Sequence, residues 1–411
     1  MNDLPYILGL LFLLALFLRL DFVFYIIYVV GAIWALARWG TPRSLAAVQV
    51  QRQFTDHAFL GETIPVTIEI ENPSRLPLPW LRVTEALPVE LATAAQLKRV
   101  YSLRPRSALQ ISYDLHCTRR GYYPVGPLQL TTGDLFGFAP IHHRQETGQA
   151  ITVYPRIVPL TALGLPARLP FGTLASHERI FEDPARPRGV RAYTPGDSQR
   201  RINWKASAHS DALLIRQYSP AISLESTILL NLSIHEYERQ WRYSASEWAV
   251  TVAASLAVWL ESVRQAVGLA VFAADSATTT PLEILNPVES SLFKVPARPG
   301  RPHLMKVLEV LARSELLDTR APFITWAQRA AAPLAWGSTA LVVTPNGNEA
   351  TTQGLHHLVR KGLNVVMLVV EPYHRFEIVQ QRARLLGIAA YPVANEDELH
   401  RLQAQGQRGP A

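Results

Sequence analysis

The chain has 411 residues, of which 48% are hydrophobic and 18% are charged. This balance excludes a disordered or fibrous protein, and the length suffices for two or three domains. Its single cysteine, Cys117, excludes an intramolecular disulfide framework and a cysteine-rich metal site. The formal net charge of +7 favours anionic partners such as lipid headgroups, acidic proteins or nucleic acid, although mostly solvated arginines are the preferred explanation.

Two apolar stretches open the chain, at residues 4–18 and 22–37, with a charged break at Arg19 between them. One continuous helix through both would be about 50 Å long, well beyond a hydrocarbon core of about 30 Å. We therefore expect a transmembrane helical hairpin over residues 1–40, in which Arg19 and Arg38 reach the headgroups. A re-entrant hairpin in one leaflet is the alternative. No basic segment precedes the apolar run, which argues against a signal peptide.

Basic residues follow the second apolar stretch at Arg38, Arg43 and Arg52. The positive-inside bias places the chain after about residue 40 in the cytoplasm, on the same side as the N-terminus. The sequence thus predicts a protein of the inner or plasma membrane, with the lipid bilayer as a partner and its soluble domains facing the cytoplasm.

Residues 41–155 have the pattern of an all-β domain. From Ile64 to Ile70, apolar and polar residues alternate with the period of a half-buried strand. A turn signal follows, and a second strand is predicted at Trp80–Val83. Further strands are expected at residues 109–117, 127–132 and 150–154. Short strands at this spacing are typical of an immunoglobulin-like sandwich.

Residues 156–224 form a connector that is rich in proline and arginine. So long a loop between domains usually serves a purpose. Within it, the segment from Thr194 to Asp197 predicts a tight turn, because proline fixes φ and glycine accepts positive φ. Asp197 is placed to cap a short helix that runs to about Ala208. A strand is expected at Leu213–Tyr218.

From Ser226 onward, predicted strands and helices alternate. The run Thr227–Leu232 is apolar throughout, as in the centre of a parallel sheet. Further strands are expected at residues 268–272, 339–343, 365–370 and 389–393, and long helices at 244–266 and 301–317. This alternation predicts a doubly wound α/β domain over residues 225–400, of the Rossmann-like and von Willebrand A-like kind. The polar tail, 401–411, is expected to be disordered.

Open parallel sheets bind ligands at the carboxyl ends of their strands. The first strand of the α/β domain leads into Asn231, Ser233 and His235. In von Willebrand A-type domains this position holds Asp-x-Ser-x-Ser, whose oxygens bind a divalent cation. Here only Ser233 is kept, Asn231 is neutral, and His235 offers a nitrogen that suits Mg²⁺ poorly. The sequence therefore predicts a degenerate site that holds neither a metal nor a cofactor.

No grouping of residues points to catalysis. Adjacent histidines at 142–143 and 356–357 point in different directions on a strand or helix, and are expected at the surface. Ser207 is close to His209, but so near a neighbour does not face the serine as a base must. Phosphate-binding and dinucleotide-binding glycine patterns are lacking in the sequence. We therefore predict that the protein is not an enzyme and binds no small molecule.

The connector concentrates the remaining candidate residues. They are Tyr193, Pro195, Gly196, Asp197, Arg200, Arg201, Asn203, Trp204, Ser207 and Arg216. The favoured interpretation is structural: Trp204 and Ile202 anchor a helix on the α/β domain, and the arginines tie it down. Contact with a protein or lipid is one alternative, and nucleic-acid binding through phosphate pairing and stacking is another. Acidic residues among the arginines argue against nucleic acid.

The segment Tyr193–Ser207 reads Tyr-x-Pro-Gly-Asp-x-x-Arg-x-Ile-x-Trp-x-x-Ser. This pattern resembles the family called domain of unknown function 58. Three upstream stretches are similar to the same family: Thr118–Pro127, Asp134–Gly137 and Val153–Arg156. The likeness is expected to extend over nearly the whole chain.

The resemblance implies a membrane hairpin, a β-sandwich and a von Willebrand A-like domain. Members of the family are commonly encoded beside a MoxR-type AAA+ ATPase and other von Willebrand A proteins, which implies a partner or adaptor of that ATPase in protein assembly or maturation. The chain departs from the family at His209, where an arginine is usual, and in its degraded metal pattern. Both departures weigh against metal-dependent binding.

The leading hypothesis from the sequence is a membrane-anchored adaptor that faces the cytoplasm and docks through the connector. A cell-envelope hydrolase is an alternative, which requires a deep pocket that joins Asp197, Asn231, Ser233 and His235. The other alternative is weak binding of nucleic acid or another anionic ligand at the basic connector.

Overall fold

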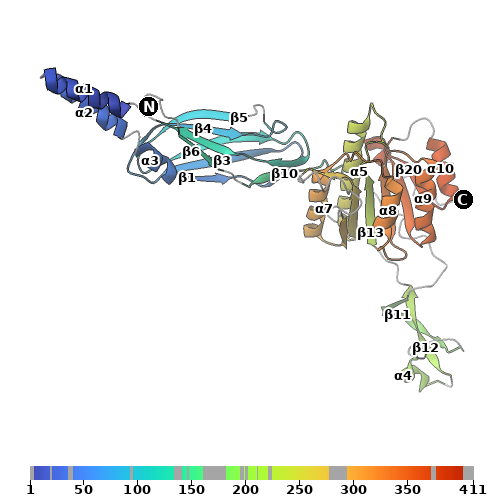
Figure 1. Ribbon diagram of the computed structural model, residues 1–411. Coiled ribbons are helices and arrows are strands. Elements are labelled where there is room, and N and C mark those ends of the chain that lie inside the picture. Colours follow the sequence, from blue (N-terminus) through green and yellow to red (C-terminus); the bar gives the residue numbers. More distant parts are fainter. Residues whose placement is uncertain are drawn as a thin grey trace. The chain divides into compact units, whose positions relative to one another are not determined.

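The computed structural model describes residues 4–18, 21–35, 40–92, 96–133, 141–145, 148–160, 182–194, 199, 202–210, 212–220, 225–276, 294–371 and 376–400. The chain divides into two compact units, Met1–Pro155 and Arg156–Ala411, which Figure 1 shows with their elements labelled. Each unit folds around hydrophobic clusters of its own.

The N-terminal unit begins with α1 (Leu4–Leu18) and α2 (Asp21–Ala35), which pack with Phe12 edge-on to Phe24 at 5.5 Å between ring centroids. Each helix has 15 residues, which makes it about 22 Å long, against about 30 Å of hydrocarbon. Among the described residues, none of the helices combines the length and apolar character needed to cross a bilayer. The expected two-helix membrane anchor, and the inner-membrane location based on it, are therefore wrong.

The rest of this unit is built of β-strands after the short helix α3 (Thr41–Ala47). The strands are β1 (Gln49–Gln53), β2 (His57–Phe59), β3 (Thr63–Asn72), β4 (Leu78–Ala86), β5 (Gln96–Leu103), β6 (Ser107–His116), β7 (Gly121–Pro124), β8 (Leu128–Thr132), β9 (Ile141–Gln145) and β10 (Ala150–Tyr154). They form three sheets, ordered β1-β3-β6, β2-β10-β7 and β5-β4-β8-β9.

Alternation along β3 determines which side chains enter the core. Ile64, Val66, Ile68 and Ile70 are all buried, and exposed or half-buried residues separate them. Because successive side chains of a strand point to opposite faces, this pattern places one apolar face inward. Ile68 and Ile70 join a cluster with Leu81 and Val83 of β4, so residues from two of the sheets share one core.

A buried ion pair joins strands of two different sheets in this unit. The Arg52 guanidinium on β1 contacts the Glu85 carboxylate on β4, and the side chains are 2% and 0% exposed. Arg52 Nη1 also donates to the carbonyl oxygen of Val125 at 3.2 Å. Burial raises the pKa of the Glu85 carboxyl, and the positive charge of Arg52 opposes that rise. Burial, together with the charge of Glu85, also raises the pKa of the Tyr113 hydroxyl far above its usual value.

The second unit contains a six-stranded sheet in the order β16-β14-β13-β18-β19-β20. Its strands are β13 (Glu225–Asn231), β14 (Ala266–Phe272), β16 (Lys294–Arg298), β18 (Thr339–Thr344), β19 (Asn364–Val369) and β20 (Ala389–Pro392). All neighbours pair in parallel except β16, which is antiparallel at the edge. The helices are α5 (Arg242–Ser262), α7 (Arg301–Arg313), α8 (Phe323–Ala331), α9 (Glu349–Arg360) and α10 (Phe376–Leu385).

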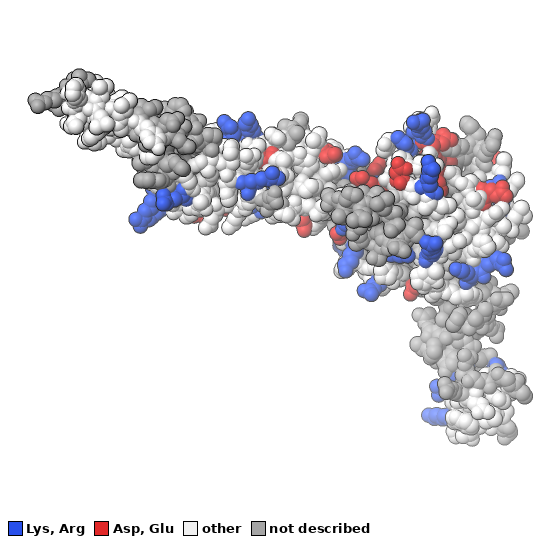
Figure 2. All heavy atoms as spheres, in the orientation of Figure 1, with Lys and Arg blue, Asp and Glu red and all other residues white. Residues whose placement is uncertain are grey.

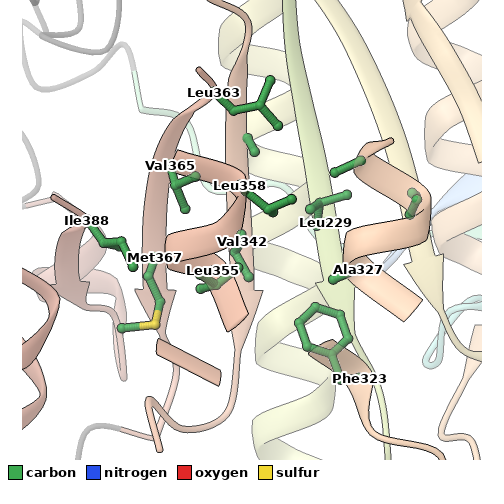
Figure 3. Packing of buried hydrophobic residues seen from close by; sticks show 14 of the residues in the cluster. Leu229, Phe323, Ala327, Val342, Leu355, Leu358, Leu363, Val365, Met367 and Ile388 are labelled. Carbon is green, nitrogen blue, oxygen red and sulfur yellow. The ribbon is translucent and has the colours of Figure 1, made fainter. Parts of the chain in front are cut away.

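The core of this unit explains the apolar runs in its central strands. Figure 3 shows Leu229 of β13 and Val342 of β18 with Phe323 and Ala327 of α8, in a cluster that also includes Leu355 of α9. Residues 226–231 of β13 are all buried, although neighbouring side chains point to opposite faces. Helices therefore cover both faces of the sheet, as parallel sheets require.

Two helices end earlier than their sequences predict. The helix expected to reach residue 266 ends at Ser262, because β14 already begins at Ala266. The helix expected to reach Leu317 ends at Arg313, because Ser314–Glu315 (β17) pairs with Ala274–Asp275 (β15). Arg313 Nε donates to Asp275 Oδ1 at 3.1 Å and fixes that junction. The tail, 401–411, lies outside the described residues.

Candidate functional site

Part of the connector folds into a two-stranded antiparallel element, which we call the arm. It consists of β11 (Glu182–Ala192), α4 (Trp204–Ser207) and β12 (Leu214–Pro220). Val190 pairs with Arg216 across the two strands. Ile202 forms a bridge to Ile215, whose side chain is 3% exposed. The arm thus has a small apolar centre of its own.

Hydrogen bonds to β12 fix the backbone of α4. Asn203 caps the helix, because its Oδ1 accepts from the Ala206 amide at 3.3 Å. The Asn203 amide donates to the Leu214 carbonyl at 2.8 Å, and the Leu214 amide donates to Ser207 Oγ at 2.8 Å. The predicted cap, Asp197, lies outside the described residues. The described helix α4 begins at Trp204, where pairing with β12 positions Asn203 as its cap.

Among the arm residues whose side chains the structure describes, Trp204 is the most exposed large apolar one. Its side chain is 67% exposed. The backbone before and after it is fixed, because Asn203 and Ser207 are both hydrogen-bonded to Leu214. Ile202, the other residue expected to anchor the connector helix on the α/β domain, is half-buried. Val190 and Leu213 are 46% and 45% exposed. The arm presents an indole and two aliphatic side chains to the surroundings.

Charged side chains around Trp204 are basic where the structure describes them. Lys205 and Arg216 are exposed, and Arg191 Nη1 donates to Thr194 Oγ1 at 3.2 Å. On the face seen in Figure 2, Lys and Arg side chains lie on the described part of the arm. Tyr193 is half-buried, and its amide donates to the Leu213 carbonyl at 2.7 Å. Pro195, Gly196, Asp197, Arg200 and Arg201 lie outside the described residues.

The carboxyl edge of the sheet holds the residues at the degenerate metal positions. The chain leaves β13 toward β14 on one side and returns to β18 on the other, so the topological switch point lies between β13 and β18. Asn231, which ends β13, is fully buried. Its Nδ2 donates to Glu236 Oε2 at 2.8 Å and to Thr344 Oγ1 of β18 at 3.3 Å. Asn231 therefore bridges the switch point.

Hydrogen bonding within the protein also occupies the acceptor of Asn231. Its Oδ1 accepts from the Ser233 amide at 3.0 Å, and Ser233 is 2% exposed. His235 is exposed and pairs through Nε2 with Asp318 Oδ1 at 2.8 Å. Among the described residues, no three His, Cys, Asp or Glu side chains are grouped to hold a metal ion.

Glu236 is the residue that sequence reasoning missed at this edge. Besides Asn231, it accepts from the Phe323 amide through Oε1 at 3.2 Å, and its carbonyl accepts from Asn346 Nδ2 at 2.7 Å. It thereby connects the ends of β13 and β18 to the start of α8. The sequence offered one signal for Glu236, a carboxylate shortly after a buried strand. Its role could not be predicted from that signal, because two of its partners are 87 and 110 residues away in the chain.

The chain thus combines two compact units, a mostly parallel sheet covered by helices, and a basic arm with an exposed tryptophan. It is a multidomain protein of mixed α/β structure. The sequence profile described as "Protein of unknown function DUF58" matches residues 189–397. That range covers half of the chain and includes most of the arm and the sheet. The chain belongs to this family. The matched region is narrower than the near-complete likeness expected from the motifs.

A curated relative is "Uncharacterized protein YeaD" of Bacillus subtilis (strain 168), which is 23% identical over 219 residues. The match covers 52% of this chain and 52% of the relative, so the chain spans about half the relative's length. Solved structures are less similar. The CARDB domain of the PF1109 protein from Pyrococcus furiosus has 13% identity and a TM-score of 0.19, covering 26% of this chain and 91% of that one.

A β-glucosidase from Listeria innocua has 10% identity and a TM-score of 0.16, covering 26% of this chain and 16% of that one. Neither likeness carries weight for fold or activity at these scores.

Proposed function

We propose that this protein is a non-enzymatic interaction protein that docks through its arm onto a MoxR-type AAA+ ATPase, in the assembly or maturation of other proteins. The observation that carries the proposal is Trp204, which is 67% exposed on a helix whose backbone is fixed by β12. A rigid, exposed tryptophan loses little entropy on binding, and tryptophans dominate the energetics of protein interfaces.

The basic side chains around Trp204 give the docking surface a preferred partner charge. Lys205 and Arg216 are exposed on the described part of the arm. Rim charges of one sign accelerate encounter with an oppositely charged surface and make association depend on salt. We propose an acidic patch on the ATPase as the counterpart, with other von Willebrand A proteins as further partners.

We also propose a fold for each of the two large domains. Residues 41–155 would form an immunoglobulin-like sandwich, and residues 225–400 a von Willebrand A-like domain.

The hydrolase alternative is not retained. It requires Ser233 and Asn231 to face a pocket, but Ser233 is 2% exposed and the Asn231 amide is bonded to Glu236 and Thr344. Nucleic-acid binding is an outcome of the test below, because an exposed tryptophan among basic residues also suits base stacking.

Replacing Trp204 with alanine is expected to weaken capture of the purified ATPase by the tagged full-length protein at least tenfold, since an interface tryptophan commonly contributes about 2 kcal/mol or more. Binding is measured by titration in a pulldown. Leu385→Ala, at a site 87% exposed on α10, is the matched control and is expected to bind like the parent protein. Equal capture by Trp204→Ala and the parent protein, or no capture by either, contradicts the proposal.

Charge-reversal variants and salt dependence distinguish protein docking from the nucleic-acid alternative. Lys205→Glu combined with Arg216→Glu is expected to slow association with the ATPase and to reduce its dependence on salt. Filter binding of a single-stranded oligonucleotide at low salt is expected to show no retention. Strongly salt-dependent retention that Trp204→Ala abolishes would instead assign the arm to nucleic acid.

A further inference from the structure

A pocket of about 370 Å³ opens at the carboxyl edge of the sheet, apart from the arm. It lies between the first two turns of α5 and the residues that follow β19 and β20. Its lining residues are Trp241, Ser244, Ala245, Trp248, Val370, Glu371 and Ala394. This is the side of a parallel sheet on which ligands bind, and the volume is that of a small ligand site.

Two tryptophans form the aromatic part of the wall. Trp248 is fixed, because its Nε1 donates to the Val393 carbonyl at 2.7 Å. Trp241, the residue before α5, is 52% exposed and stands at the entrance. Ala245, Val370 and Ala394 add small apolar surfaces. A long side chain with an aliphatic stem suits such a wall.

One carboxylate lines the pocket. Glu371 is 7% exposed, and its Oε2 accepts from the Glu238 amide at 3.3 Å. Its own amide donates to the Pro345 carbonyl at 3.0 Å, so the backbone that carries it is held to the loop after β18. A second carboxylate, that of Glu398, accepts from the Ala394 amide at 2.7 Å beside the pocket.

Among the described residues, two arginines contact side chains that are close in sequence to the pocket residues. Arg242, in the first turn of α5, lies with Cζ 5.0 Å from the centre of the Tyr243 ring. Arg156 pairs with Glu396, two residues beyond Ala394, at 2.6 Å. The pocket thus combines aromatic faces with the carboxylate of Glu371. Aromatic faces attract cations, and a carboxylate forms its strongest hydrogen bonds with a cationic donor.

We propose that this pocket binds the side chain of an arginine or lysine residue from a partner protein, with the cationic head at Glu371 and the stem along Trp241 and Trp248. An anionic group would be repelled by Glu371. The proposal does not rest on arm docking, because the two surfaces share no residue, and either can fail alone.

The test uses full-length protein with ¹⁵N-labelled tryptophan, titrated with N-acetyl-arginine amide. Citrulline has nearly the same shape as arginine but no charge, so N-acetyl-citrulline amide is the matched probe. The indole signals of Trp241 and Trp248 are assigned with Trp→Phe variants. We expect their chemical shifts to change when the arginine probe is added and to remain unchanged with the citrulline probe. Equal shifts with both probes, or none with arginine, would overturn the proposal.

Removing the charge of the pocket tests the role of Glu371. Glu371→Gln is expected to weaken arginine binding about tenfold, as for loss of one charge-assisted hydrogen bond. Glu377→Gln, at an exposed site in the first turn of α10, is the control and should bind like the parent protein. Trp241→Ala is the second variant if Glu371→Gln does not fold, and it should also weaken binding. Unchanged affinity in either folded pocket variant contradicts the proposal.

Discussion

Replacing Arg52 with methionine is expected to lower the free energy of unfolding of the N-terminal unit by about 3–5 kcal/mol. The change leaves the carboxylate of Glu85, whose side chain is 0% exposed, without the charge that compensates its burial. Urea unfolding of the full-length protein measures the loss. Hydrogen–deuterium exchange of peptides from β1, β3 and β4 assigns it to this unit.

Two further variants separate the ion pair from simple packing. The double variant Arg52→Met/Glu85→Leu is expected to recover most of the lost stability, because a well-packed apolar pair replaces a buried ion pair at little cost. Arg99→Met, at an exposed site on β5, is the control and should change stability by less than about 0.5 kcal/mol. A double variant as unstable as Arg52→Met alone would show that lost packing dominates.

The pH dependence of Arg52→Met follows from the direction of the Glu85 pKa. Burial already raises that pKa above its ordinary value of 4.5, and the charge of Arg52 lowers it. Without Arg52 the pKa of the folded state rises further. A raised pKa gives stability that is present at low pH and is lost as the pH passes through the folded-state value. The destabilisation should therefore be larger at pH 8 than at pH 5.

Replacing Asn231 with aspartate is expected to lower the free energy of unfolding by about 2–4 kcal/mol at neutral pH. The substitution restores the acid of the von Willebrand A pattern, but it puts a second carboxylate where Nδ2 now lies 2.8 Å from Glu236 Oε2. Two carboxylates at that distance cannot both ionise cheaply, so one pKa is raised. The loss of stability should shrink as the pH falls and the introduced carboxyl takes up a proton.

Addition of Mg²⁺ distinguishes this result from a repaired metal site. Asn231 and Ser233 are buried and hydrogen-bonded within the protein. We therefore expect the Asn231→Asp variant to stay unstable when MgCl₂ is added at about 5 mM. Asn348→Asp is the matched control: Asn348 caps α9, and an aspartate keeps that cap. Full rescue of Asn231→Asp by Mg²⁺ would show that the edge accepts a cation.

Local patterns predicted the elements whose formation depends on near neighbours. The alternation from Ile64 to Ile70 predicted the strand that the structure places at β3, and the run Thr227–Leu232 predicted β13. Helix ends were less predictable: α7 stops at Arg313 because β17 pairs with β15, some 40 residues earlier in the chain. A pairing partner so far away leaves no mark in the helix's own periodicity.

For the site residues too, local patterns in the sequence were informative and long-range contacts were not predictable. The turn, asparagine and tryptophan between Tyr193 and Ser207 mark an unusual segment, but the choice of Asn203 as helix cap depends on its bond to Leu214. Exposure of Trp204 could not be predicted, because an apolar residue in a short helix serves burial and binding equally well. Glu371 and the two pocket tryptophans come from two distant segments and carry no joint motif.

By itself, the sequence determined the family, through the ordered pattern from Tyr193 to Ser207, and the apolar periodicities that form strands. Only the tertiary structure decided how charged and polar residues are used. Arg52, which the sequence suggested as a flank of a membrane segment, is the buried partner of Glu85. Asn231, which resembled a metal position, bridges two strands. The physical reason is that apolar burial follows local spacing, whereas a buried charge or amide requires a partner that folding brings from elsewhere in the chain.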